Sequence, residues 1–222
     1  LYTNTTGANN VALGHSALAA NTTSTAQTAV GYNALRLATG HYNTALGYEA
    51  LGSNSTATEN VAIGANAAAS TTTGNLNVSV GSHAFLDNTT GLRNTSVGAY
   101  ALSNNTTASD NSAFGNNALL SNTTGTQNIA IGVNALDANT TANYNIAIGY
   151  DALGANTTGT ENTAIGTNAL DDNTTASYNT AVGTSALGAN TTGAYNTALG
   201  WNSLLANTTG ATNVAVGVSA LD

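Results

Sequence analysis

The 222-residue sequence contains no cysteine, no proline, no methionine and no lysine. Without cysteine there is neither a disulfide framework nor a thiolate metal site, and the composition does not indicate an oxidising or a reducing compartment. Charged residues make up only 5% of the chain, against roughly 25% in an average globular protein. Arg36 and Arg93 are the only strong cations and the net charge is −8, so the electrostatic basis for binding nucleic acid or an anionic membrane is missing.

Long hydrophobic runs are also missing. No apolar stretch approaches the roughly 20 residues that span a bilayer, and no charged segment of the kind that begins a signal peptide is found. We therefore expect no membrane contact from this segment. Any secretion signal or anchor is expected outside the chain.

Glycine, asparagine, threonine and alanine dominate instead, and they recur with a period of 17 residues. We call each period a coil and number its positions from the residue that begins it. One interval, between Gln27 and Asn43, is one residue short within the segment 36–40. The coils begin at Asn10, Gln27, Asn43, Asn60, Asn77, Asn94, Asn111, Asn128, Asn145, Asn162, Asn179, Asn196 and Asn213.

The consensus of one coil is N-[TVI]-A-[IVL]-G-x-x-A-L-x-x-N-T-T-[GA]-x-x. Two bulky apolar positions, the fourth and the ninth, do not make the 3.6-residue periodicity of a helix. The alternation around the fourth position indicates a short strand, with the large fourth residue facing inward and the small third residue facing outward. Coils stacked about 4.8 Å apart would align identical residues into columns and into hydrogen-bonded ladders of Asn and Thr. The sequence thus predicts an all-β fold, a parallel β-solenoid (β-roll) of about thirteen coils in a single domain, residues 1–222.

The fifth position is glycine in every coil. A glycine at the end of a strand indicates a positive φ or a close backbone approach, which a tight corner requires. These structural corner residues are Gly14, Gly31, Gly47, Gly64, Gly81, Gly98, Gly115, Gly132, Gly149, Gly166, Gly183, Gly200 and Gly217.

The third position is Ala or Ser throughout, from Ala12 to Ala215. If these residues face outward, they form a smooth uncharged stripe against which a partner chain could pack closely. The core of a single coil is also thin, because only the fourth and ninth residues are bulky. We therefore expect a homo-oligomer and, as its form, a homotrimer. Neither end carries an atypical capping coil, which indicates a segment of a longer fibrous protein.

The unit Asn162-Thr-Ala-Ile-Gly-Thr-Asn-Ala-Leu170 resembles the head repeats of YadA-like trimeric autotransporter adhesins. Asn43-Thr-Ala-Leu-Gly-Tyr-Glu-Ala-Leu51 is similar to repeats of bacterial and phage tail-fibre-domain proteins. The resemblance implies a left-handed, trimeric β-roll that projects from a cell or virion surface. The 17-residue period and the added Asn-Thr-Thr-Gly corner shift the weight towards the tail-fibre-like proteins.

Two functions remain open: a passive shaft that spaces or presents a binding tip, and an adhesive head that itself binds a host-surface glycan or protein. Near-identical coils favour the shaft. Irregular segments, 27–43 and 60–93 with the off-consensus Ala68, Thr71 and Phe85, are the first places to expect a binding patch. Aromatic side chains, which can stack on sugar rings, are the possible glycan contacts: Tyr32, Tyr48, Tyr150 and Trp201 at the sixth position, and Tyr42, Tyr144, Tyr178 and Tyr195 at the seventeenth. The alternative is a variable, half-exposed corner with scattered aromatics.

Three further interpretations are weaker. The repeated Asn-Thr-Thr is formally an N-glycosylation sequon, although a structural corner explains it equally well. Columns of threonine are a feature of ice-binding surfaces, but these threonines flank a corner and do not form a flat array. Catalysis finds no support, because His15, His41 and His83 occupy unrelated positions and the acidic pair Asp171-Asp172 lacks a base. We expect no enzyme activity, no cofactor and no metal.

Overall fold

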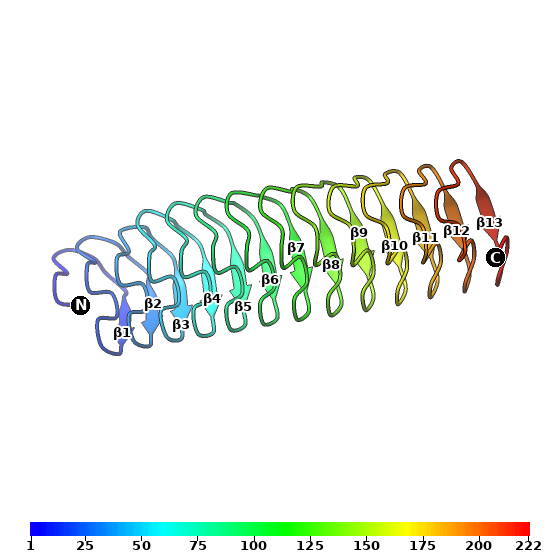
Figure 1. Cartoon of the computed structure of the whole chain (residues 1–222). Coiled ribbons are helices and arrows are strands. Elements are labelled where there is room, and N and C mark those ends of the chain that lie inside the picture. Colours follow the sequence, from blue (N-terminus) through cyan, green and yellow to red (C-terminus); the bar gives the residue numbers. More distant parts are fainter. The chain divides into compact units, whose positions relative to one another are not determined.

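A computed structural model describes all residues from Leu1 to Asp222. Each coil contributes one three-residue strand, and a turn-rich loop completes the coil (Figure 1). The thirteen strands are β1 (Val11–Leu13), β2 (Thr28–Val30), β3 (Thr44–Leu46), β4 (Val61–Ile63), β5 (Val78–Val80), β6 (Thr95–Val97), β7 (Ser112–Phe114), β8 (Ile129–Ile131), β9 (Ile146–Ile148), β10 (Thr163–Ile165), β11 (Thr180–Val182), β12 (Thr197–Leu199) and β13 (Val214–Val216). The predicted all-β parallel β-solenoid is confirmed.

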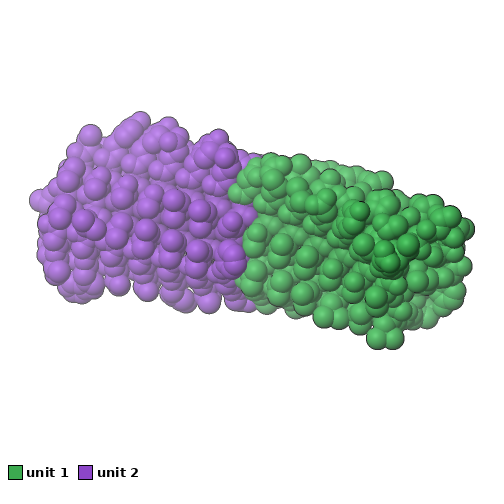
Figure 2. Space-filling view, turned by 180° about the vertical axis from the view of Figure 1, so that it is seen from behind, with its two compact units in different colours: residues 1–110 green, residues 111–222 purple.

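The chain divides into two compact units, residues 1–110 and 111–222 (Figure 2). Unit 1 contains β1 to β6 and unit 2 contains β7 to β13, and within each unit every strand pairs in parallel with the next one in the sequence. Equivalent positions of neighbouring coils are partners, as in Ala130↔Ala147. The short coil does not shift the strand register: Thr28 pairs with Thr44, the equivalent residue of the next coil.

The orientation of the strands differs from the sequence-based prediction, which was wrong about both faces. The small third residue points inward: Ala130 is fully buried, while its neighbours Ile129 and Ile131 are exposed. The same inversion holds at Ala164 and Ala198. The reason is the narrow cross-section of the coil. The Leu at the ninth position and the Ala at the eighth already fill the interior, so only a small side chain fits beneath the strand.

The ninth-position Leu is buried as predicted, with Phe85 and Ala68 as its substitutes in adjacent coils. Its backbone was not anticipated: Leu136, for example, has a φ of 55°, in the left-handed region. The seventh and seventeenth positions are also left-handed, as Asn134 and Tyr144 show with φ values of 56° and 60°. Non-glycine residues seldom adopt this region, so the stacked coils must hold it in place.

The glycine corner is confirmed on both counts. At Gly132 the φ is 140°, and an added Cβ would lie 2.3 Å from the carbonyl oxygen of Gly149 in the next coil. All thirteen corner glycines have a φ between 128° and 143°. Glycine is therefore required both by the local conformation and by the contact between coils.

Asparagine ladders at the first and twelfth positions replace part of an apolar core. At the first position, the Oδ1 of Asn111 accepts a hydrogen bond from the backbone N–H of Asn128 (2.9 Å). The Nδ2 of Asn128 donates across the coil to the carbonyl of Ala142 (2.8 Å). At the twelfth position, the Nδ2 of Asn139 donates to the Oδ1 of Asn122 (2.8 Å). The predicted amide ladders are thus present, and they are buried rather than superficial.

Candidate interaction surfaces

The outward fourth residues of the strands, together with those second residues that are apolar, form an exposed surface that we call the apolar strand face; Thr or Ser holds the second position in seven of the thirteen strands. In unit 2 it includes Phe114, Ile129, Ile131, Ile165, Leu199, Val214 and Val216, and in unit 1 it includes Val11, Leu13, Leu46, Ile63 and Val78. Ile131 is 41% exposed and Leu46 is 45% exposed. Soluble monomers seldom expose so many apolar side chains on one face, and such faces mark sites of interaction.

The aromatic candidates lie on the surface, as their positions at the corners suggest, and all eight are exposed. Several stack on one another along a column. The ring of Tyr32 lies between His15 and Tyr48, with centroids 5.4 and 5.3 Å apart. Tyr178 and Tyr195 stack at 4.9 Å. Stacked rings cover each other's faces, which are the surfaces that a sugar ring would need.

Tyr150 and Trp201 stand alone in the sixth-position column. Their neighbours in adjacent coils are small or aliphatic, Val133 and Thr167 beside Tyr150, and Thr184 and Val218 beside Trp201. Each is about half exposed. The structure therefore does not bring the eight candidates into one cluster, and within each unit they occupy separate columns.

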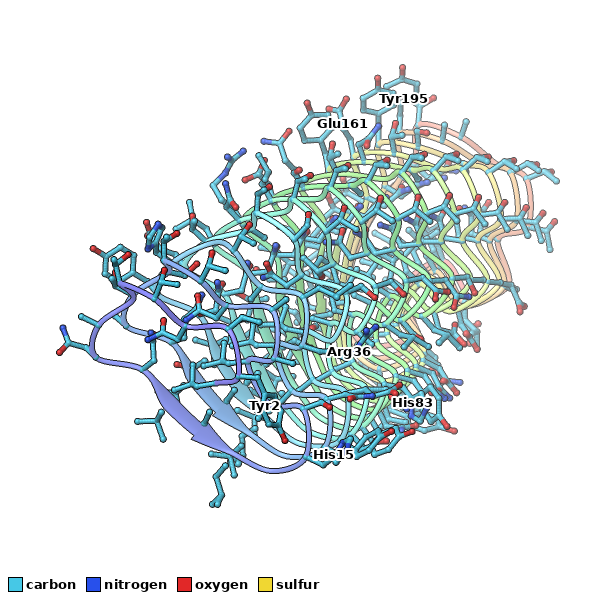
Figure 3. The ribbon with its side chains drawn as sticks, turned by 90° about the vertical axis from the view of Figure 1, so that its left-hand side faces the viewer. Tyr2, His15, Arg36, His83, Glu161 and Tyr195 are labelled. Atoms are coloured by element: carbon cyan, nitrogen blue, oxygen red, sulfur yellow. The ribbon has the colours of Figure 1, made fainter.

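Sequence reasoning missed the aromatic pair at the seventh position, where His83 stacks on Tyr100 at 5.1 Å. His15 and His83 both lie along one edge of unit 1 (Figure 3). The signal was available, because His83 and Tyr100 are 17 residues apart and so belong to one column.

The seventeenth-position column of unit 2 adds a carboxylate between aromatic residues. Glu161 lies one coil from Tyr144 and one coil from Tyr178, and its charge raises the pKa of the Tyr178 hydroxyl. A shallow cavity of about 360 Å³ is lined by Tyr144 and Glu161. Glu161 and Tyr195 project from the same edge of the unit (Figure 3).

Acidic side chains gather at the tenth position of unit 2. Burial raises the pKa of Asp137 and of Asp171, and the nearby charge of Asp151 raises both further. The Nδ2 of Asn168 donates to the Oδ2 of Asp171 (3.3 Å). No group of three or more His, Asp or Glu residues has a metal-binding arrangement.

The only ion pair of the chain joins Arg93 and Asp110 at the seventeenth position of adjacent coils. The Nε and Nη2 atoms of Arg93 donate to the two carboxylate oxygens of Asp110, at 2.6 and 2.9 Å. This hydrogen-bonded pairing lowers the pKa of Asp110. Arg36, the other strong cation, has no carboxylate partner and lines a cavity of about 230 Å³ in unit 1.

The sequon asparagines lie inside the coil, except Asn4, which is exposed, and Asn207, which is half-buried. Asn139, Asn156 and Asn173 are fully buried, and their side-chain amides donate within the ladder and to the carbonyl three residues later. A glycan on such a nitrogen would displace the ladder. The structural explanation of the repeated Asn-Thr-Thr therefore accounts for these residues.

The first threonine of each of several sequons, at the thirteenth position, is also hydrogen-bonded. The Oγ1 of Thr123 donates to the carbonyl of Thr140 (3.0 Å), and Thr157 repeats this bond with Thr174. These hydroxyls serve the stacking of coils and are not free to order water.

The structure contains no helix with the length and hydrophobicity needed to cross a membrane. No family model matches the chain, and neither a curated protein nor a solved structure does, so its function is inferred from the residues of a parallel β-solenoid.

Proposed function

We propose that this chain is a structural segment, a shaft or a head, of an extracellular fibre on a cell or virion surface, in which copies of the chain associate through the apolar strand face. The carrying observation is the set of exposed Ile, Val, Leu and Phe side chains on β1, β3, β4 and β5 in unit 1 and on β7, β8, β10, β12 and β13 in unit 2. Burying these residues against a second copy would remove a continuous apolar surface from water.

A second copy is a suitable partner because the face is uncharged and repeats with the spacing of the coils. The third-position stripe was expected to be the contact, and the inversion of the strand moves this role to the second and fourth positions. Larger side chains there provide more area for packing than Ala would. The family resemblance favours three copies and a location outside the cell.

The shaft is favoured over a glycan-binding head that uses the corner aromatics. Coils of unit 2 repeat the same contacts from one to the next, which suits a spacer. The stacked rings of Tyr32, Tyr48, Tyr178 and Tyr195 are mutually covered, which lessens their use as sugar platforms. An ice-binding role has less support, because the threonine hydroxyls at the thirteenth position bond between coils.

Sedimentation velocity of the chain at micromolar concentration tests the association. We expect a trimer. The double substitution Ile131→Lys and Ile165→Lys places two charges on the apolar strand face and should give monomers. A matched control, Thr141→Lys and Thr175→Lys, adds the same charge to exposed positions of the same two coils and should leave the trimer intact. A monomeric wild type, or equal behaviour of the two double variants, would contradict the proposal.

A further inference from the structure

Unit 1 contains a hollow that has no counterpart in the consensus coil. It is lined by Asn33 and Arg36 from the second coil, Glu49, Gly52 and Ser53 from the third, and Ala69 and Ser70 from the fourth, and its volume is about 230 Å³. We call it the polar trough. It falls within the irregular part of the chain, at the short coil.

The trough exists because two coils with small side chains lie between two coils with large ones. At the tenth and eleventh positions the third and fourth coils carry Gly52-Ser53 and Ala69-Ser70. The flanking coils carry Arg36-Leu37 and Leu86-Asp87 at the same positions. Three coil spacings, about 14 Å, separate the two large pairs. A single sugar residue fits this length, while a folded partner does not.

The charged groups of the trough are one cation and one anion. The side chain of Arg36 makes no ion pair and no hydrogen bond within the chain, whereas that of Arg93 is paired with Asp110. A guanidinium carries five donors in a planar fork that matches a carboxylate. The trough therefore contains the one strong cation whose donors are free for a ligand.

The remaining polar groups suit hydroxyls. Glu49 is held in place by Asn33, whose Nδ2 donates to its Oε1 (3.2 Å), and by the Tyr48 hydroxyl; a carboxylate accepts about four hydrogen bonds, so acceptor sites remain for a ligand. Ser53 and Ser70 also line the trough, and only their backbone N–H groups are bonded, to the carbonyls of Ala69 and Leu86. Their hydroxyls can both donate and accept. Such alternating donors and acceptors around a small cavity are the chemistry of a polyhydroxylated ligand.

We propose that the polar trough binds a hexuronic acid residue of an acidic polysaccharide. Arg36 pairs with the carboxylate, and Glu49, Ser53 and Ser70 bond the ring hydroxyls. The net charge of −8 opposes an anionic ligand at long range, so we expect a Kd of about 1 mM for one sugar residue. None of the lining residues belongs to a strand. The site is thus separate from the apolar strand face, and its failure would leave the proposed association unaffected.

Isothermal titration with methyl β-D-glucuronoside tests the site, with methyl β-D-glucoside, sodium acetate and glycine as comparison probes. We expect the glucuronoside to bind at least tenfold more tightly than the other three. Arg36→Gln should abolish measurable binding. The matched control Arg93→Gln removes the other arginine and should leave the affinity unchanged within twofold.

A variant that fills the trough without changing its charge tests whether binding needs the cavity as well as the charge of Arg36. Ala69→Leu introduces at the tenth position the residue that Leu86 already provides in the next coil, so the fold should tolerate it while the trough is closed. Its circular dichroism spectrum should match the wild type, and binding should be lost. No heat of binding with 50 mM glucuronoside, or equal binding by Arg36→Gln, would overturn the proposal. Equally tight binding of acetate would reduce the site to a simple anion contact and overturn its saccharide part, and equally tight binding of glycine would replace the sugar by an amino acid.

Discussion

The regular coils of unit 2 and the irregular coils of unit 1 are built on the same backbone but differ in their interior. In unit 2 the twelfth-position ladder runs without interruption through Asn122, Asn139, Asn156, Asn173, Asn190 and Asn207. In unit 1 it is interrupted by Ala38 and Thr71. Between them, Asn54 is buried with neither side-chain atom bonded. Strand register is the same in both regions, so the backbone ladder and the glycine corner hold the register, and the side-chain ladder adds stability to it.

The short coil shows how an irregularity is accommodated. Elsewhere a first-position Asn reaches the carbonyl 14 residues later, as Asn43 does with Ala57 (2.9 Å). In the coil that lacks one residue this position is Gln27, whose longer side chain donates to the carbonyl of Gly40, 13 residues later. Its Oε1 still accepts from the backbone N–H of Asn43 (3.1 Å). The extra methylene of Gln27 thus preserves the hydrogen bond across the coil.

The largest expected effect concerns the two kinds of glycine in these regions. Gly132→Ala should destabilise unit 2 by about 3–5 kcal/mol, because the new Cβ meets the backbone of Gly149 and the φ of 140° is unfavourable for Ala. Gly52→Ala, in the irregular region, should cost less than about 1 kcal/mol, because its φ is ordinary and its nearest contact is 3.1 Å. Urea denaturation followed by circular dichroism measures both, and Trp201 fluorescence reports on unit 2 alone. Similar costs at the two glycines would refute the role of the corner.

The next largest effect concerns the twelfth-position asparagine ladder, which one substitution interrupts in unit 2 and another extends in unit 1. Asn139→Ala removes donors to Asn122 and Ala142 and leaves buried acceptors unpaired, which should cost about 2–4 kcal/mol. Thr71→Asn should instead stabilise unit 1 by about 1 kcal/mol, because an amide there can bond the unsatisfied side chain of Asn54. Denaturant midpoints of the two variants should move in opposite directions. A destabilising Thr71→Asn would show that the interruption is not a defect of the ladder.

The smallest effect is a pH dependence of unit 2, opposite in sign to the one that the lowered pKa of Asp110 gives unit 1. The pKa values of Asp137 and Asp171 are raised in the folded chain by burial and by Asp151, so folding disfavours their charged forms. Their contribution to stability is fully present below the ordinary carboxyl pKa and is lost as the pH rises through the raised values. The thermal midpoint seen by Trp201 fluorescence should therefore increase slightly between pH 7 and pH 4.

The double variant Asp137→Asn and Asp171→Asn should flatten this dependence. The equivalent tenth positions Arg36, Gly52 and Ala69 of unit 1 contain no carboxylate, which makes unit 1 the internal comparison. The assignment would be contradicted if the thermal midpoint of the double variant changed as steeply between pH 7 and pH 4 as that of the wild type. A wild-type midpoint that decreases on mild acidification would also contradict it.

The repeat by itself determined the period, the parallel solenoid, the glycine corner and the buried ninth-position Leu. These follow from local requirements and from identical residues in register, which a 17-residue period reveals directly. Even the Asn ladders could be anticipated, because amides one coil apart can only bond along the stack. The irregular segment around the short coil, where a binding patch was expected, contains the polar trough, and binding there stays a prediction.

Only the tertiary structure decided which face of the strand is inside. Alternation in Ile129-Ala-Ile131 separates two faces but does not say which one is buried, and the usual preference for burying the larger residue was misleading. The narrow coil leaves room for Ala130 beneath the strand, with Leu136 and the Asn ladders filling the rest. The polar trough likewise depends on side chains from three coils that only stacking brings together. The left-handed backbone of Leu136 is imposed by stacking, since nothing local favours it.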